Sequence, residues 1–357
     1  PSIFRSLRRR FSAAGTSSRY GVDTTRIGRH SNAPHRYHER CVSHRMRRRC
    51  RGACVVGPMN AACYARPRKK WAMKRAVLQT IAETAVSGTP ADVAALLERH
   101  CRARSWRKHG LRLARILRSG NWNDRLFSIF VKGNGKLPFW AFSTLPGVTC
   151  PGAGSCLSWC YSFKAWRYPA AFMRQLQNTL LLRSAEGRAR IAAAWARLPK
   201  GTTVRLYVDG DFDSLETLAF WFDRCRERTD LNAYGYSKSW SIFIAYAARN
   251  AVPSNYWLNV SSGSLHDGNS VIRAALDRIA VTRGDFVAIE TTTRANYTSK
   301  GKQQQREHLA ELRDKGRELF GRPVFACPGR CGTCTPDGHA CGSERFKGVP
   351  IVIATHA

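Results

Sequence analysis

The chain has 357 residues, of which 59 are Lys or Arg and 24 are Asp or Glu, giving a formal net charge of +35. A hydrophobic share of 43% is enough for a buried core and excludes a chain that is disordered throughout. A positive field of this size attracts polyanions, so we expect nucleic acid as the partner, DNA before RNA. No apolar run approaches the ~20 residues that span a bilayer, so we expect no membrane partner.

The sequence contains 13 cysteines. The first 30 residues are rich in arginine and lack the apolar core of a secretory signal, so we expect a cytoplasmic protein. In that reducing compartment, cysteines point to metal binding before disulfides.

Residues 1–70 hold 18 Lys or Arg against two acidic residues and have no period of 2 or 3.6. Such a composition cannot bury enough apolar surface to order itself. We therefore predict a disordered, Arg-rich arm here, of a kind that binds nucleic acid.

Residues 71–120 are predicted to form a small basic helical region. Thr89 and Pro90 have the residue types of a helix start, with Asp92 in the first turn. A further helix over about 105–117 carries five basic side chains, at Arg107, Lys108, Arg112, Arg115 and Arg118. These residues are candidates for nucleic-acid binding. A solvated basic face packed on the main domain is the equal alternative.

Residues 121–357 are predicted to form one α/β domain. Strands are expected at 126–131 and 137–142, followed by a helix over 169–197. Strands then alternate with helices: strands at 204–208, 232–236, 257–260, 286–289, 323–326 and 349–354, and helices at 215–225, 241–248, 271–279 and 306–319. This alternation predicts a (β/α) barrel-like parallel sheet, either a partial or a closed TIM-like barrel.

Polar side chains follow the expected parallel strands, where ligands bind in such folds. The candidates for catalysis are Asp209, Asp211, Tyr236, Lys238, Asn259 and Glu290, with His356 after the last strand. Asp211 suits a general base or the support of a metal site, and Lys238 suits an anionic substrate. The alternatives are a helix N-cap, best provided by Asp213, and a solvated lysine.

Two cysteine groups are the strongest signal. Cys150, Cys156 and Cys160 lie on a loop rich in Gly and Pro, and they are the candidates for cofactor binding. The second metal-ligand candidates are Cys327, Cys331, Cys334 and Cys341. Thiolates bind iron–sulfur clusters and zinc, so we expect a cluster, 4Fe–4S first, with zinc as the alternative and unliganded thiols as the third reading.

The spacing C-x3-C-x2-C of the second group is the one that radical S-adenosylmethionine enzymes use. In those enzymes, however, the triplet follows the first barrel strand, whereas here it follows the fifth. S-adenosylmethionine is therefore a secondary expectation.

Several further stretches occur in a recognisable order and spacing: Phe139-Trp-Ala-Phe-Ser143, Cys150 to Tyr161, Val204 to Leu206, Gly210 to Phe212, Trp221, Tyr236 to Lys238, Asn259 to Ser261, Cys327, Pro328, Cys334, Cys341 and Pro350 to His356. With these motifs the chain resembles the phage gene product 88-like family of phages, plasmids and related elements, over about residues 126–357. The resemblance implies a radical-SAM-like or related barrel with a cysteine-bound centre in a mobile-element protein. Cys331 and the basic extension before residue 126 depart from the family pattern.

Three hypotheses follow for function. The first is an iron–sulfur protein of a mobile element that acts on nucleic acid as a modification or processing enzyme. The second is a non-enzymatic DNA-binding replication or regulatory protein, in which zinc or iron–sulfur only holds loops together. The third is a magnesium-dependent nuclease using Asp209, Asp211 and Asp213. The sequence leaves open whether the protein is an enzyme.

Overall fold

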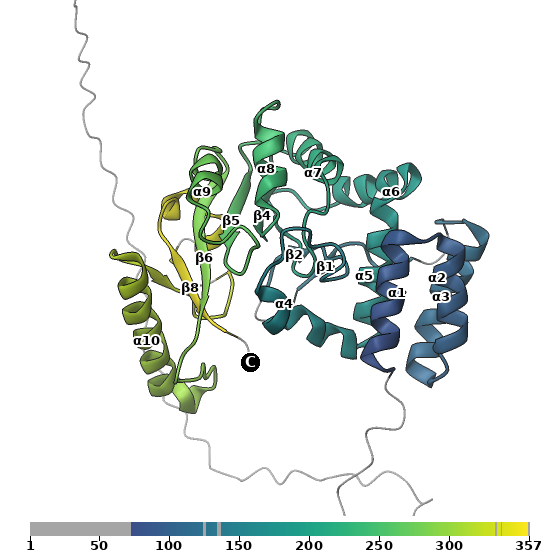
Figure 1. The fold of residues 1–357 in the computed structure, drawn as a ribbon, viewed down its shortest axis with the longest axis horizontal. Coiled ribbons are helices and arrows are strands. Elements are labelled where there is room, and N and C mark those ends of the chain that lie inside the picture. Colours follow the sequence, from purple (N-terminus) through teal and green to yellow (C-terminus); the bar gives the residue numbers. More distant parts are fainter. Residues whose placement is uncertain (1–72, 124–125, 134–136, 333, 337, 356–357) are drawn as a thin grey trace, which may run out of the picture. The chain divides into compact units, whose positions relative to one another are not determined.

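A computed structural model describes residues 73–355, except 124–125, 134–136, 333 and 337 (Figure 1). The arm predicted for residues 1–70 and the strand-end His356 lie outside the described residues. No helix in the described part is both long and apolar enough to cross a bilayer.

Eight strands in the described residues form one sheet in the order β1-β2-β3-β4-β5-β6-β8-β7. β1 pairs antiparallel with β2, and all other pairs are parallel. Figure 1 shows β4, β5, β6 and β8 side by side. The strands are β1 (Val131–Lys132), β2 (Trp140–Ala141), β3 (Thr203–Leu206), β4 (Asn232–Ser237), β5 (Tyr256–Ser261), β6 (Thr282–Ile289), β7 (Phe325–Ala326) and β8 (Ile351–Ala354).

The sheet is open, with β1 and β7 at its two edges. The mostly parallel α/β sheet is thus confirmed, whereas a closed TIM-like barrel is not. The edge strands β1 and β7 are only two residues long, shorter than the expected strands, and so offer little backbone for closure.

Side chains alternate between the two faces of the sheet because successive residues of a strand point in opposite directions. Val204 and Leu206 belong to the main hydrophobic core. Arg205 lies on the other face, in register with Tyr234 of β4. Tyr234 packs there in a second core with Cys341, which comes from the segment that follows β7.

Helices cover the main-core face. α7 (Leu215–Glu227), α8 (Trp240–Ala247) and α9 (Ser270–Asp277) follow β3, β4 and β5 and contribute Trp221, Phe243 and Leu276 to the main core. α10 (Lys302–Phe320) packs through Leu312 on Val352 of β8. The second face is covered instead by the segment with η4 (Ala340–Gly342) and η5 (Glu344–Phe346).

The helical region predicted over 71–120 is confirmed and contains α1 (Arg75–Ser87), α2 (Pro90–His100) and α3 (Arg104–Ser119). Thr89 caps α2 as expected: its Oγ1 accepts from the Asp92 amide at 3.2 Å, and the Asp92 carboxylate accepts from the Thr89 amide at 2.9 Å. Trp106 of α3 packs on Phe172, with ring centroids 5.8 Å apart. The helical region and the sheet therefore share the main core.

Three local predictions were wrong. The strand expected over 126–131 is not formed except at Val131, where β1 begins. The helix expected over 169–197 is divided into α5 (Pro169–Leu182) and α6 (Ala185–Ala196), because Ser184 caps α6 by accepting from the Gly187 amide at 3.0 Å. The N-cap of α7 is Ser214 and not Asp213, since the Ser214 hydroxyl accepts from the Thr217 amide at 3.1 Å.

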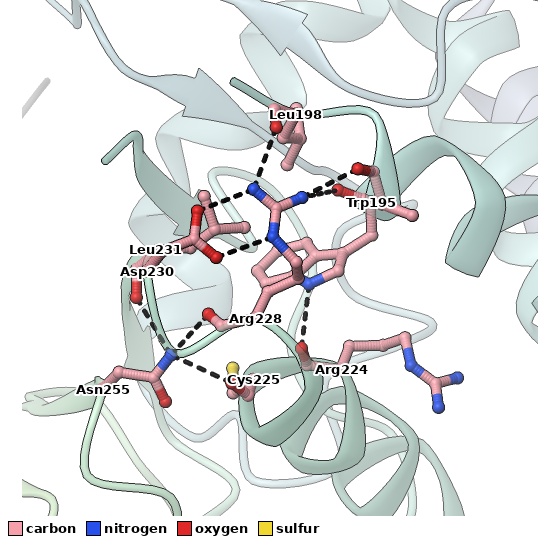
Figure 2. A network of polar contacts seen from close by, with 9 residues as sticks. Trp195, Leu198, Arg224, Cys225, Arg228, Asp230, Leu231 and Asn255 are labelled. Carbon is pink, nitrogen blue, oxygen red and sulfur yellow. Dashed lines mark hydrogen bonds and ion pairs between the residues drawn. The ribbon is translucent and has the colours of Figure 1, made fainter. Parts of the chain in front are cut away.

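The amino edge of the sheet is held by the polar network in Figure 2. Arg228 pairs with Asp230 at 2.7 Å and donates to the carbonyls of Ala196 and Leu198, at the end of α6. Asn255 donates its amide to three carbonyls, those of Cys225, Arg228 and Leu231, at 2.9–3.0 Å. Carbonyl groups at the end of a helix have no donor within the helix, and this network supplies donors to such carbonyls.

Candidate functional site

The first cysteine group lies on the loop between β2 and α5, which contains α4 (Cys156–Trp159) and η2 (Tyr161–Arg167). Hydrogen bonds join this loop to the residues after β5: the Cys156 amide donates to Gly263 O at 3.3 Å, and Leu265 N donates to Gly152 O at 3.0 Å. A Cβ at Gly152 would stand 1.9 Å from the Lys238 carbonyl oxygen. The loop thus needs glycine to bring its thiols against the carboxyl edge of the sheet.

Cys150, Cys156 and Cys160 line one cavity of about 120 Å³. The thiols interact electrostatically, Cys150 with Cys160 and Cys156 with Cys160. Burial raises the pKa of Cys150 and of Cys156. The fold therefore brings the three predicted cofactor ligands together.

Three of the strand-end candidates, Asp211, Tyr236 and Lys238, line the same cavity. Asp211 is only 4% exposed, and its two carboxylate oxygens accept from the amides of Phe212 and Lys238, both at 2.8 Å. Burial raises the pKa of this carboxyl group, whereas the hydrogen bond from the Lys238 amide lowers it by a smaller amount. The Lys238 ammonium donates to Ser261 Oγ at 2.8 Å. The cavity thus joins the ends of β3, β4 and β5.

Arg205 of β3 also lines this cavity, and sequence reasoning missed it as a site residue. Its guanidinium lies 4.5 Å from the ring centroid of Tyr236 and donates to the Tyr161 hydroxyl at 3.3 Å. Its Nε is buried and lacks a hydrogen-bond partner among the described residues. The available signal was a charged side chain inside an apolar strand, between Val204 and Leu206.

Tyr207, the residue after β3, has a φ of 56°, and it is the non-glycine residue with positive φ in the described part of the chain. That region is unfavourable for a bulky side chain. The ring is buried, and its hydroxyl accepts from Trp221 Nε1 at 3.0 Å, which fixes the turn. After this turn, Asp209 and Asp211 face different cavities.

Asp209 and Glu290 line a neighbouring groove of about 820 Å³. Asp209 accepts from Gln175 Nε2 at 2.8 Å, and burial raises the pKa of its carboxyl group. Tyr161 and Ser162 line both the groove and the thiol cavity, so the two are adjacent. This separation of Asp209 from Asp211 does not favour a shared magnesium ion, which the nuclease hypothesis needs.

Asn259 has a different environment. It is fully buried, and its amide donates to the carbonyls of Gly235 and Cys341 at 3.0 and 2.9 Å, while its Oδ1 accepts from Arg283. Asn259 therefore ties the second cysteine segment to the sheet.

The second cysteine group forms a separate set. Cys327 interacts electrostatically with Cys331, Cys334 and Cys341. The Gly329 amide donates to Cys327 Sγ at 3.4 Å. Burial raises the pKa of Cys331, and the positive charge of Arg205 opposes this. Arg205 thus lines the cavity of the first group, and its charge lowers the pKa of a thiol in the second group.

The nine cysteines in the described residues are all free. Within the same residues, no three His, Cys, Asp or Glu side chains converge closely enough to hold one metal ion. The metal centre stays a prediction.

A family model described as Gene product 88 matches residues 123–340. The chain belongs to the gene product 88 family. The resemblance seen in the sequence is thereby confirmed, while the radical-SAM-like description is not. Neither the curated proteins nor the solved structures contain a match to the chain.

The region matched by the gene product 88 model includes the thiol cavity and three of the four cysteines of the second group, and it begins after α3. On α3, Arg107, Lys108 and Arg115 are exposed. Arg112 packs on the Phe127 ring and donates to Leu126 O at 2.6 Å, and Arg118 pairs with Glu98 at 3.0 Å. Two of the five basic candidates thus have structural contacts.

Proposed function

We propose that this gene product 88 family member is an iron–sulfur enzyme that modifies or processes nucleic acid for a mobile element. The observation that carries the proposal is the cavity at the carboxyl edge of the sheet. There, the three thiols of the first group meet Asp211 and Lys238.

The donor set fits a cluster. Three cysteine ligands leave one iron of a 4Fe–4S cluster open, and thiolates are the ligands that such clusters use. The backbone of Gly147 and of Gly154 lowers the pKa of Cys150 and of Cys156, respectively, and so favours their thiolate forms. Arg205 and Lys238 add positive charge beside them. The thiols would have to turn toward a common centre, which rotation about χ1 allows.

The protein's own groups have distinct roles in this proposal. Held by Cys150, Cys156 and Cys160, a cluster would supply electron transfer or a binding position for one substrate atom. Lys238 and Arg205 bind and orient an anionic group, such as a phosphate. Asp211, whose pKa burial raises, accepts or returns a proton at its carboxylate oxygens.

The first test is anaerobic purification of the full chain, followed by the visible spectrum and by iron, sulfide and zinc per chain. We expect a coloured protein with about four irons per cluster. Cys156→Ser should lose iron and colour, whereas Cys225→Ala, a matched control at a buried cysteine of α7, should keep both. A colourless parent with about one zinc per chain would refute the iron–sulfur assignment.

A finer form of the proposal adds S-adenosylmethionine as a co-substrate. Its support is the open fourth position that three cysteine ligands leave. Protein with an intact cluster is incubated with reductant and S-adenosylmethionine, and 5′-deoxyadenosine is measured. Absence of that product would exclude the radical form alone and leave the cluster assignment standing.

The second candidate function is a non-enzymatic DNA-binding protein with a structural metal. It is favoured by the second cysteine group, because four thiolates fill the tetrahedral shell of zinc and leave no open position. In the part of the chain that the structure describes, its segment covers a sheet face with the short helices η4 and η5. Asp211→Asn separates the two functions: an enzyme keeps its DNA affinity and loses activity, whereas a simple binder is unaffected.

A further inference from the structure

The groove beside the thiol cavity has two walls that differ in sequence origin. One wall comes from η2 and the start of α5, with Tyr161, Lys164 and Tyr168. The other wall comes from the loop between β6 and α10, with Arg294 and Tyr297. Both walls therefore combine tyrosine rings with basic side chains.

The rings of the first wall are unusually open to solvent. Tyr168 is 66% exposed and Tyr161 is 38% exposed, although large aromatic side chains are mostly buried. A 3₁₀ helix has three residues per turn, so Tyr161 and Lys164 lie on the same face of η2. A ring and a positive charge thus stand one turn apart along the groove.

The second wall repeats this chemistry. The guanidinium of Arg330 lies 5.2 Å from the ring centroid of Tyr297 and donates to its carbonyl oxygen at 3.0 Å. This contact orients the Tyr297 ring and adds positive charge behind it. The acidic groups of the groove are Asp209, which Gln175 binds, and Glu290 at the end of β6.

We propose that this groove binds a single-stranded nucleic acid, with bases stacked on the tyrosine rings and phosphates beside Lys164 and Arg294. Rings that alternate with basic groups are how proteins bind single strands, because every base has a face that can stack. A duplex keeps its bases stacked on each other and cannot use the rings. Since Tyr161 and Ser162 line both spaces, the bound strand lies next to the thiol cavity.

This inference deepens the proposed function by naming its substrate class, but the binding itself requires no metal. The test measures fluorescence anisotropy of labelled single-stranded DNA, the same sequence as RNA, and the duplex, with the full chain at fixed salt. Single strands should bind more tightly than the duplex. The comparison of single-stranded DNA with RNA shows which of the two the groove binds more tightly.

Tyr168→Ala should weaken single-strand binding about fivefold to 100-fold, as expected for the loss of one stacked base. Arg294→Gln should weaken it less and reduce the salt dependence. Arg249→Gln is the matched control: it removes the same charge from an exposed site at the end of α8 and should change nothing.

Photo-crosslinking of a strand carrying 5-iodouracil then locates the contact directly, and we expect crosslinks at Tyr161, Tyr168 or Tyr297. Parent-like affinity in both Tyr168→Ala and Arg294→Gln, or crosslinks only outside the groove, would overturn the proposal. Iron measured on the same samples distinguishes the two failures: binding without iron contradicts only the cluster, and iron without groove binding contradicts only the groove.

Discussion

The polar side chains at the two edges of the parallel sheet differ in how completely they are hydrogen-bonded. At the amino edge, Arg228 and Asn255 each donate to several carbonyls, and Asp230 neutralises the arginine (Figure 2). At the carboxyl edge, Arg205 has a buried Nε without a partner in the described residues, and it pairs with none of the carboxylates there.

The difference teaches where stability and chemistry reside. Polar groups whose hydrogen bonds are made hold a fold together, whereas a buried polar atom without a partner costs free energy and persists where a ligand completes it. The amino edge therefore supports the structure, and the carboxyl edge carries the candidate site.

The largest expected effect is at the amino edge. Asn255→Ala removes two N–H donors that three carbonyls share and should lower the free energy of unfolding by about 2 kcal/mol, measured by urea denaturation. The control Asn250→Ala removes one bond, to Tyr246 O, and should cost about 1 kcal/mol or less. An equal loss in the free energy of unfolding of the two variants would contradict a larger stabilisation by the amino-edge network.

At the carboxyl edge we expect the opposite pattern. Arg205→Met removes a half-buried charge that forms no ion pair with a carboxylate in the described residues, so the unfolding midpoint of the metal-free protein should stay or rise. Iron retained per chain should fall about tenfold, because the positive charge beside the thiolates is lost. Arg205→Lys keeps that charge and should recover part of the iron. A large loss of stability in Arg205→Met would show that Arg205 stabilises the fold, and it would contradict the proposed difference between the two edges.

The smallest effect is a difference in pH dependence. Hydrogen bonds from Arg228 lower the pKa of Asp230 to about 2. The stabilisation by this pair is therefore complete above the unfolded pKa of ~4 and is lost as the pH falls toward about 2. Burial raises the pKa of Asp209, so its charged form costs stability, and that cost appears as the pH rises from ~4 through the folded pKa.

Unfolding midpoints across this pH range check both signs. Asp230→Asn should reduce the loss of stability in acid, and Asp209→Asn should reduce the loss as the pH rises. Identical pH profiles for the two variants would remove the electrostatic difference between the edges.

Local sequence determined the elements and the grouping of the cysteines. Thr89 and Asp92 mark the start of α2, and the strands and helices after residue 200 lie close to the expected ranges, because short-range periodicity and capping decide them. The ends of β3 and β4 also placed Asp211 and Lys238 at one edge, since parallel strands end together.

Tertiary structure alone decided the rest. Contacts between residues far apart in the chain decide whether the sheet closes, and they direct Asp209 and Asp211 to different cavities. They also join Asn259 to Cys341 and place Arg205 at both thiol groups. Periodicity identifies which residues share a face. It does not identify what covers that face, and here the segment after β7 does so.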